Sequence, residues 1–204
     1  MRFKLIALLT LFTSPFVVAS DQLENIYEQE ARELVKEFVG QLKPQLKKAM
    51  QEGGPTLAIE SCATTAPAIA DALAAQTGWE VRRVSLKTRN ASRAEPDDWE
   101  RSVLIKFDQR QAAGERSPTI NFGELRGDYY RYMQAQGVDP VCLVCHGEQL
   151  TEPVKAMLDD YYPNEQATGY SLGQLRGAIS LSKPMVCDRL DEKDGQLCQA
   201  KPLN

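Results

Sequence analysis

Residues 142–146 read Cys142-Leu143-Val144-Cys145-His146, a C-x-x-C-H motif. This pattern is typical of covalent c-type haem attachment, in which two thiols form thioethers with the haem vinyl groups and the following histidine binds the iron. The stretch must form about one helical turn, because positions i and i+3 then project from the same face. The chain has one histidine, and its place directly after C-x-x-C favours haem attachment over a redox dithiol or half of a zinc site.

The N-terminus is typical of a secretory signal peptide over residues 1–20. It begins with two basic residues, continues with an apolar run at 5–18 and ends in the small residues Ala19 and Ser20. The run is interrupted by polar residues and is shorter than the ~20 residues that a membrane span needs. We therefore expect export to the periplasm and one domain over 21–204 without a membrane span; an uncleaved N-terminal anchor is the alternative.

The charge of the chain argues against one class of partner. The formal net charge is −4, and it becomes −6 once the two basic residues of the signal peptide are removed. Nucleic acids and anionic membranes are bound by basic patches, so an acidic chain is a poor candidate for either. A redox partner protein or a small diatomic ligand suits a haem protein better.

The five cysteines divide into three groups. Cys142 and Cys145 belong to the haem motif. Cys187 and Cys198 flank a polar stretch with an Asp-Gly turn signal, so an oxidising compartment favours a disulfide between them. Closing so short a loop would stabilise the tail by roughly 2–3 kcal/mol. Cys62 is then the odd thiol.

The first third of the chain is expected to be helical. Apolar residues recur three and four positions apart over 21–52, which predicts an amphipathic helix. Pro44 is expected to kink this helix, and the glycines at 53–54 to end it. A second helix is expected to start at 64–65, which leaves Cys62 in the junction before it.

The rest of the chain mixes helices and strands without regular alternation. Such an order predicts an α+β domain with a largely antiparallel sheet. The expected elements are strands at 79–86, 117–125, 128–135 and 174–183, a helix from Asp97 or Asp98 to about Ala113, and a short helix at 153–160.

The second axial ligand of the iron cannot be another histidine of this chain, because there is none. The remaining candidates are an open or water-filled position and the sulfur ligands Cys62, Met50, Met133, Met157 and Met185. Spacing alone does not choose among them. A free cysteine is also commonly a small buried core residue.

Four stretches, taken together, resemble the mono-haem c-type cytochromes of PAS-like fold. They are A-I-E-S-C-A-T-T-A-P-A-I-A (58–70), V-S-L-K-T-R-N with D-D-W-E (84–100), C-L-V-C-H-G (142–147) and A-T-G-Y-S-L-G-Q-L-R-G-A-I-S (167–180). One departure is Ala91, where the family often has proline.

The resemblance implies a central antiparallel sheet flanked by helices, with one haem c held between them. It also implies a histidine and a cysteine as axial ligands, which in this chain are His146 and Cys62. The haem propionates need cationic or amide partners, for which the candidates are Arg82, Arg83, Arg89, Asn90, Arg126 and Arg176. Arg89, Asn90 and Arg176 rank first because they lie inside the resembling stretches. Tyr170 is a candidate for the pocket lining or for the core.

Three functional classes follow from these features. A sensor of redox state or of a diatomic gas is favoured by the cysteine ligand and the PAS-like resemblance. A low-potential periplasmic electron carrier is the alternative, because no kinase, cyclase or spanning segment is visible in the sequence. An enzyme such as a peroxidase needs a distal base, and a second histidine is missing.

Overall fold

The computed structural model describes the backbone of residues 15–185 and the side chains of residues 22–185. Its centre is a four-stranded antiparallel sheet in the order β1-β4-β3-β2. The strands are β1 (Glu80–Val84), β2 (Asn121–Arg126), β3 (Tyr129–Gly137) and β4 (Leu175–Pro184). The helices are α1 (Pro15–Thr77), α2 (Ala91–Ala94), α3 (Asp98–Ala112), α4 (Leu143–His146) and α5 (Glu152–Tyr161), with 3-10 turns η1 (Ser117–Thr119) and η2 (Pro140–Cys142). The predicted α+β class, antiparallel sheet and long N-terminal helix are confirmed.

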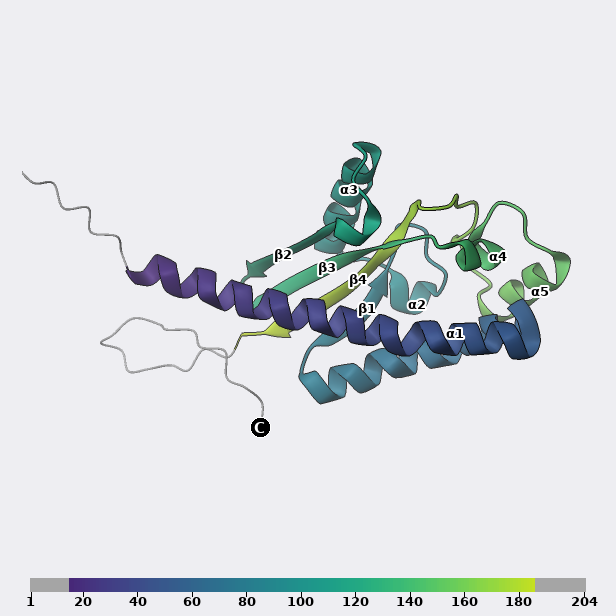
Figure 1. Cartoon of the computed structure of the whole chain (residues 1–204), viewed down its shortest axis with the longest axis horizontal. Helices are drawn as coiled ribbons and strands as arrows, with labels where there is room; N and C mark the ends of the chain where they lie inside the picture. Colours follow the sequence, from purple (N-terminus) through teal and green to yellow (C-terminus); the bar gives the residue numbers. More distant parts are fainter. Residues whose placement is uncertain (1–14, 186–204) are drawn as a thin grey trace, which may run out of the picture.

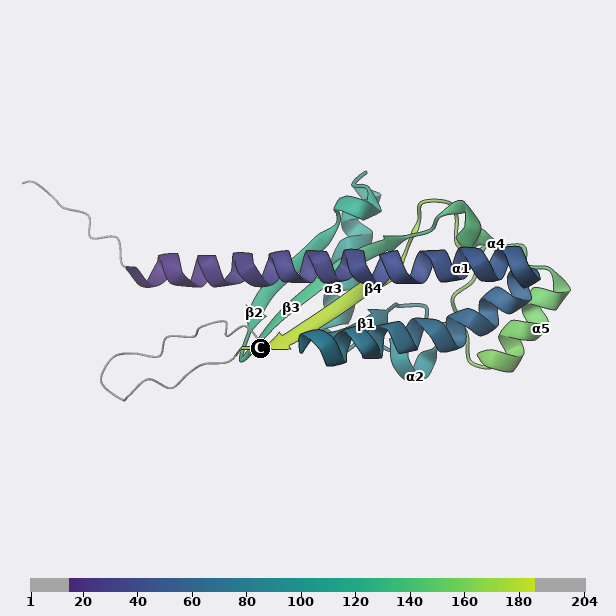
Figure 2. The same ribbon diagram turned by 60° about the horizontal axis from the view of Figure 1, so that its bottom comes forward.

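Helix α1 consists of two segments that fold back on each other at Gly54, as Figure 2 shows. Gly54 has φ 68° and ψ −158°, a conformation that is essentially restricted to glycine. The predicted helix end at the two glycines is therefore confirmed. Pro44 does not restart the helix, because Gly54 is the one residue inside α1 with non-helical angles.

The second segment of α1, residues 55–77, starts earlier than the sequence predicts. Pro55 occupies its first turn, where the missing N–H of proline removes no helical hydrogen bond. Thr64 does not cap a helix; its hydroxyl donates to the carbonyl of Glu60 one turn earlier. Cys62 consequently lies within the helix and not in a junction before it.

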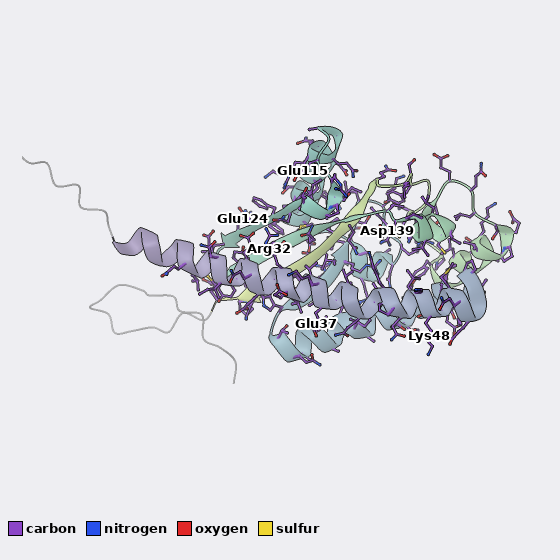
Figure 3. The ribbon with its side chains drawn as sticks, in the orientation of Figure 1. Arg32, Glu37, Lys48, Glu115, Glu124 and Asp139 are labelled. Carbon is purple, nitrogen blue, oxygen red and sulfur yellow. The ribbon has the colours of Figure 1, made fainter. Side chains whose placement is uncertain are left out.

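The two faces of the sheet are covered by different helices, α1 on one side and α3 on the other (Figure 1). Alternate residues of β3 show the division: Tyr132 packs in the core under α1, and Met133 packs in the core under α3. Each such fully buried large side chain contributes about 1.5–3 kcal/mol. Arg32 of α1 adds a polar link by donating to Asn121 Oδ1 at the start of β2, 3.0 Å away (Figure 3).

Helix α3 is fixed by the cap that the sequence predicts. The Asp97 carboxylate accepts from the Glu100 amide at 2.8 Å, and the Glu100 carboxylate accepts from the Asp97 amide at 2.9 Å, which is a capping box. Glu100 is buried, and its other oxygen accepts from the hydroxyl of Ser180 on β4 at 2.7 Å. This buried contact docks α3 onto the sheet.

Other predicted elements agree with the structure to within a few residues. The stretch predicted as a strand from 117 begins as the turn η1, and β2 starts at Asn121. The predicted disulfide between Cys187 and Cys198 lies outside the described residues, and so does most of the predicted signal peptide. Within the described part of the chain, no helix has a stretch long and apolar enough to cross a membrane.

We predict that Gly54→Ala destabilises the protein by about 1–3 kcal/mol, because an L side chain resists this backbone conformation. A Cβ at Gly54 would meet no atom within 4 Å, so the cost comes from the backbone alone. Gly40→Ala is the matched control. A Cβ at Gly40 would also meet no atom within 4 Å, but Gly40 is exposed and lies within the helix, so alanine there should stabilise the protein by roughly 0.5–1 kcal/mol. Chemical denaturation measures both, and equal effects would contradict the role of Gly54.

Candidate functional site

The C-x-x-C-H motif forms one helical turn at the end of β3, built from η2 and α4. The turn opens with a hydrogen bond from the Cys142 amide to the Asp139 carbonyl at 2.9 Å and closes with one from Gly147 to Leu143 at 2.9 Å. Asp139, labelled in Figure 3, also forms an ion pair with Lys43 of α1 at 2.9 Å. Cys142 and Cys145 are half-buried free thiols.

His146 is held by the loop that precedes β4. Its Nδ1 lies 2.7 Å from the carbonyl oxygen of Ala167, and its own carbonyl accepts from the Tyr170 amide at 2.9 Å. The Gly169 amide donates to the Gly147 carbonyl at 3.1 Å. The A-T-G-Y stretch therefore forms a small backbone clamp on the histidine.

The tautomer of His146 follows from this contact. A carbonyl oxygen only accepts, so Nδ1 carries the proton and Nε2 keeps a lone pair that a metal ion can use. Burial, with the cations Arg176 and Arg89 nearby, holds the pKa of His146 far below its usual range, so the ring is neutral. A neutral imidazole with one nitrogen fixed by a carbonyl is the usual arrangement of a ligating histidine.

Arg89 joins the same clamp from the connection after β1. Its Nη2 donates to the carbonyls of Cys145 and of Ala167, the latter at 3.0 Å. The side chain is 9% exposed, and its Nε lies 3.5 Å from the Glu165 carboxylate. Burial lowers the pKa of Arg89, and the charge of Glu165 opposes that shift. The guanidinium thus lies beside the haem motif.

A cavity of about 1570 Å³ opens beside the motif turn between α1 and the sheet. Cys142, Cys145 and His146 line it from the turn, and Cys62 lines it from the second segment of α1. The structure therefore brings the odd thiol and the histidine to one cavity. Within the described chain, the methionine that also lines this cavity is Met50.

The other candidate methionines lie elsewhere. Met133 is fully buried in the core between the sheet and α3, away from the α1 side. Met157 packs with the cluster between α1 and α5, and Met185 packs at the far end of β4. Of the candidate sulfur atoms, those of Cys62 and Met50 therefore belong to residues that line the same cavity as His146.

Arg176 reaches the cavity through a β-bulge. Gln136 of β3 pairs with Gly177 of β4, but Gly137 pairs with Leu175, so Arg176 is an extra residue in β4. Leu175 then packs under α3, while Arg176 lines the cavity together with Arg83 of β1.

Arg83, Arg89 and Arg176 form a cluster of cations, which we call the arginine cluster. Burial, Arg83 and Arg89 together lower the pKa of Arg176 to about 9. Three nitrogens of the cluster, Arg83 Nε and Arg89 Nε and Nη1, are buried without a hydrogen-bond partner in the described structure. Orphaned donors at a large cavity fit an anionic ligand, and the two propionates of a haem supply such charge.

The remaining predicted residues have other roles. Arg82 lines the cavity but lies 3.6 Å from the Glu100 carboxylate. Arg126 lies 3.6 Å from Glu124. Asn90 lines the cavity, but its Oδ1 accepts from Ser92 at 2.8 Å at the start of α2. Tyr170 is buried and packs edge-on against His146, with ring centroids 6.5 Å apart.

Sequence reasoning missed Ala167 and Glu165. Ala167 acts through its carbonyl oxygen, and every residue has one, so no side chain signals this role. The only sign is that Ala167 begins the A-T-G-Y stretch. Glu165, whose carboxylate accepts from the Ala167 amide at 2.9 Å, lies just outside that stretch.

Comparison with known proteins decides the family. The family model described as Tll0287-like, for Tll0287, matches residues 19–184. The chain belongs to the Tll0287-like family. The comparison with curated proteins found no match.

One solved structure shares both sequence and fold with the chain. It is described as the crystal structure of the cyanobacterial heme-protein Tll0287, and it is 26% identical to this member of the Tll0287-like family. The match has a TM-score of 0.58 and covers 85% of this chain and 98% of that chain. These findings support a haem-binding family, as the C-x-x-C-H motif predicts.

We predict that Arg176→Gln stabilises the haem-free protein by about 1–2 kcal/mol, because it removes one of three crowded, buried cations. For a chain of this size, each 1 kcal/mol corresponds to roughly 2–4 °C in Tm. The control Arg126→Gln removes an exposed cation and should change stability by less than about 0.5 kcal/mol. A loss of stability in Arg176→Gln would show that the cluster is neutralised without a ligand.

Proposed function

We propose that this chain is an exported c-type haem protein with one haem, attached through Cys142 and Cys145 and ligated by His146. One observation carries the proposal: Nδ1 of His146 is 2.7 Å from the Ala167 carbonyl, which leaves Nε2 as a ligand at the cavity of about 1570 Å³. The haem would supply the redox and ligand-binding chemistry of its iron. The arginine cluster would neutralise its propionates.

A redox-active dithiol explains the site less well. Haem attachment uses the two thiols, the histidine that follows them and the cavity of about 1570 Å³ that all three line. A dithiol uses the thiols alone and leaves the histidine and the cavity without a role.

Cys62 is the second axial ligand in this proposal. It lines the same cavity as His146 and Cys145. A thiolate donates charge to ferric iron and lowers the reduction potential, whereas a methionine such as Met50 would raise it. Iron binding itself would keep Cys62 deprotonated.

Sensing of redox state or of a diatomic gas is the function that this ligand set supports best. Cys62 would leave the iron on reduction, and the vacated position would admit a small ligand. The alternative is a low-potential periplasmic electron carrier. Val141 and Leu172 line the cavity and are 44% and 63% exposed. Exposed apolar side chains at a redox centre suit the docking of a partner protein, which favours the electron carrier.

Export belongs to the same proposal. Residues 1–20 would direct the chain to the periplasm as a cleaved signal peptide, and Cys187 and Cys198 would form a disulfide there. Redox partner proteins or diatomic ligands are the expected partners, and nucleic acid is not. The two parts of the proposal depend on each other, because covalent haem attachment through C-x-x-C-H presupposes an exported protein.

We predict that the wild-type chain, produced with haem-attachment machinery, retains haem after denaturation in acid and organic solvent, because thioether bonds survive this treatment. Replacing Cys142 and Cys145 together by alanine should remove the retained haem. Haem staining of a denaturing gel and mass spectrometry measure both. The control is Cys62→Ala, which should keep the haem. A wild-type chain without retained haem would refute covalent attachment.

The second ligand is tested by comparing Cys62→Ala with Met50→Leu. We predict that the optical and EPR spectra of the ferric protein change in Cys62→Ala, because thiolate ligation is lost. Met50→Leu should leave both spectra unchanged. The opposite result would assign Met50, and unchanged spectra in both variants would leave the position to water or to no ligand.

CO binding and redox titration of the wild-type protein distinguish a sensor from an electron carrier. A sensor that releases Cys62 on reduction should bind CO in its reduced wild-type form, and its redox titration should show hysteresis. A carrier should exclude CO and titrate reversibly. Reduced protein that keeps the ferric ligand set and refuses both CO and NO would rule out the sensing version.

A further inference from the structure

Arg89 makes contacts unlike those of Arg83 and Arg176. One nitrogen, Nη2, lies 2.8 Å from His146 Nδ1 and donates to both the Cys145 and the Ala167 carbonyls. Arg176 Nε is 3.4 Å from the same Nδ1. Arg89 therefore contacts the backbone on both sides of the imidazole.

The proton on His146 decides what the short contact with Arg89 means. Arginine has no acceptor atom, so Nδ1 either accepts from Nη2 or donates to Ala167. Nη2 carries two hydrogens, and the carbonyls of Cys145 and Ala167 accept both, so none is left for Nδ1. An accepting Nδ1 would also face the Ala167 oxygen lone pairs at 2.7 Å, which is repulsive. Nδ1 therefore donates to Ala167, and Arg89 acts on the histidine through the carbonyl that both share.

A shared carbonyl transmits the charge of Arg89 to the ligand. An oxygen that accepts from a guanidinium has less electron density to offer the imidazole N–H, so the N–H bond stays strong and the ring is a weaker donor. A weaker donor favours ferrous over ferric iron. The positive charge of Arg89, buried near the iron position, has the same effect directly.

We propose that Arg89 is a positioning residue for His146 that raises the reduction potential of the haem, through the carbonyls of Ala167 and Cys145. This inference rests on the proposed function. It gives Arg89 a second role, because Nη2 acts on His146 through two carbonyls while Nε and Nη1 stay without a hydrogen-bond partner in the described structure. Glu165 limits the effect, because its carboxylate lies 3.5 Å from Arg89 Nε and accepts from the Ala167 amide at 2.9 Å.

The test is the midpoint potential of the haem-loaded protein in Arg89→Gln, Arg89→Lys and Arg126→Gln. Arg89→Gln should lower the potential so that the ratio of reduced to oxidised protein at a fixed potential falls at least tenfold, about 59 mV for one electron. Arg89→Lys keeps the charge but loses the two-carbonyl contact, so its shift should have the same sign and be smaller. Arg126→Gln, a cation near the far end of the sheet, should not shift.

A second readout follows the shared carbonyl itself. In Arg89→Gln and Arg89→Lys the exchangeable Nδ1 proton of His146 should move to lower field in the NMR spectrum of the reduced protein, because its hydrogen bond to Ala167 strengthens. If Arg89→Gln does not fold, Arg89→Lys alone carries the test with both readouts.

The outcomes are distinguishable. Wild-type protein without haem would overturn the proposed function and this inference together. Haem-loaded variants with the wild-type potential and Nδ1 resonance would overturn the role of Arg89 and leave the proposed function intact. A lowered potential with an unchanged Nδ1 proton resonance would show that Arg89 acts only through its charge, and this result would also overturn the positioning role.

Discussion

The hydrogen bond between His146 Nδ1 and the Ala167 carbonyl is the contact on which the site depends. It joins the motif turn to the loop before β4, and Arg89 joins both to the connection after β1. Alone, such a bond is worth about 1 kcal/mol. Its importance is directional, because it fixes which imidazole nitrogen faces the cavity. The stretches around 89, 146 and 167 are distant in sequence, and these contacts hold them together at the cavity.

The arginine cluster costs the fold stability, because it places three cations beside the cavity. A bulge in β4 turns Arg176 toward Arg83, and both lie close to Arg89 without enough carboxylates to balance three cations. Gly177 makes the bulge possible, since a Cβ there would lie 2.3 Å from the Val84 carbonyl oxygen. On the α3 side of the same sheet, the buried Glu100 is fully paired with Ser180 and nearby arginines. Among the described residues, the buried side-chain nitrogens without a hydrogen-bond partner belong to Arg83 and Arg89, which line the cavity.

The features that could be predicted from sequence depend on local chemistry. The motif turn, the Asp97 cap and the four strands each follow from residues within a few positions of one another. The features that were missed depend on tertiary context. The early start of the second α1 segment follows from packing of Ile59 against α5, the bulge from the register between β3 and β4, and the histidine clamp from a backbone carbonyl. Pro55 and Gly177 mark two of these sites in the sequence, but neither residue alone fixes the helix start or the strand register.

The position of Cys62 relative to the motif is set by a separate cluster and not by the sheet. The ends of α1 pack on the sheet through residues such as Phe38 and Leu73, but its middle packs on α5 through Ile59. Cys145 contacts the same small cluster. Cys145 and the part of α1 that carries Cys62 are therefore positioned by the same cluster, through Ile59 and Ala63. In the proposed haem protein, release of Cys62 from the iron would then have to come from the chemistry of the thiolate and the iron, because one cluster holds both sides.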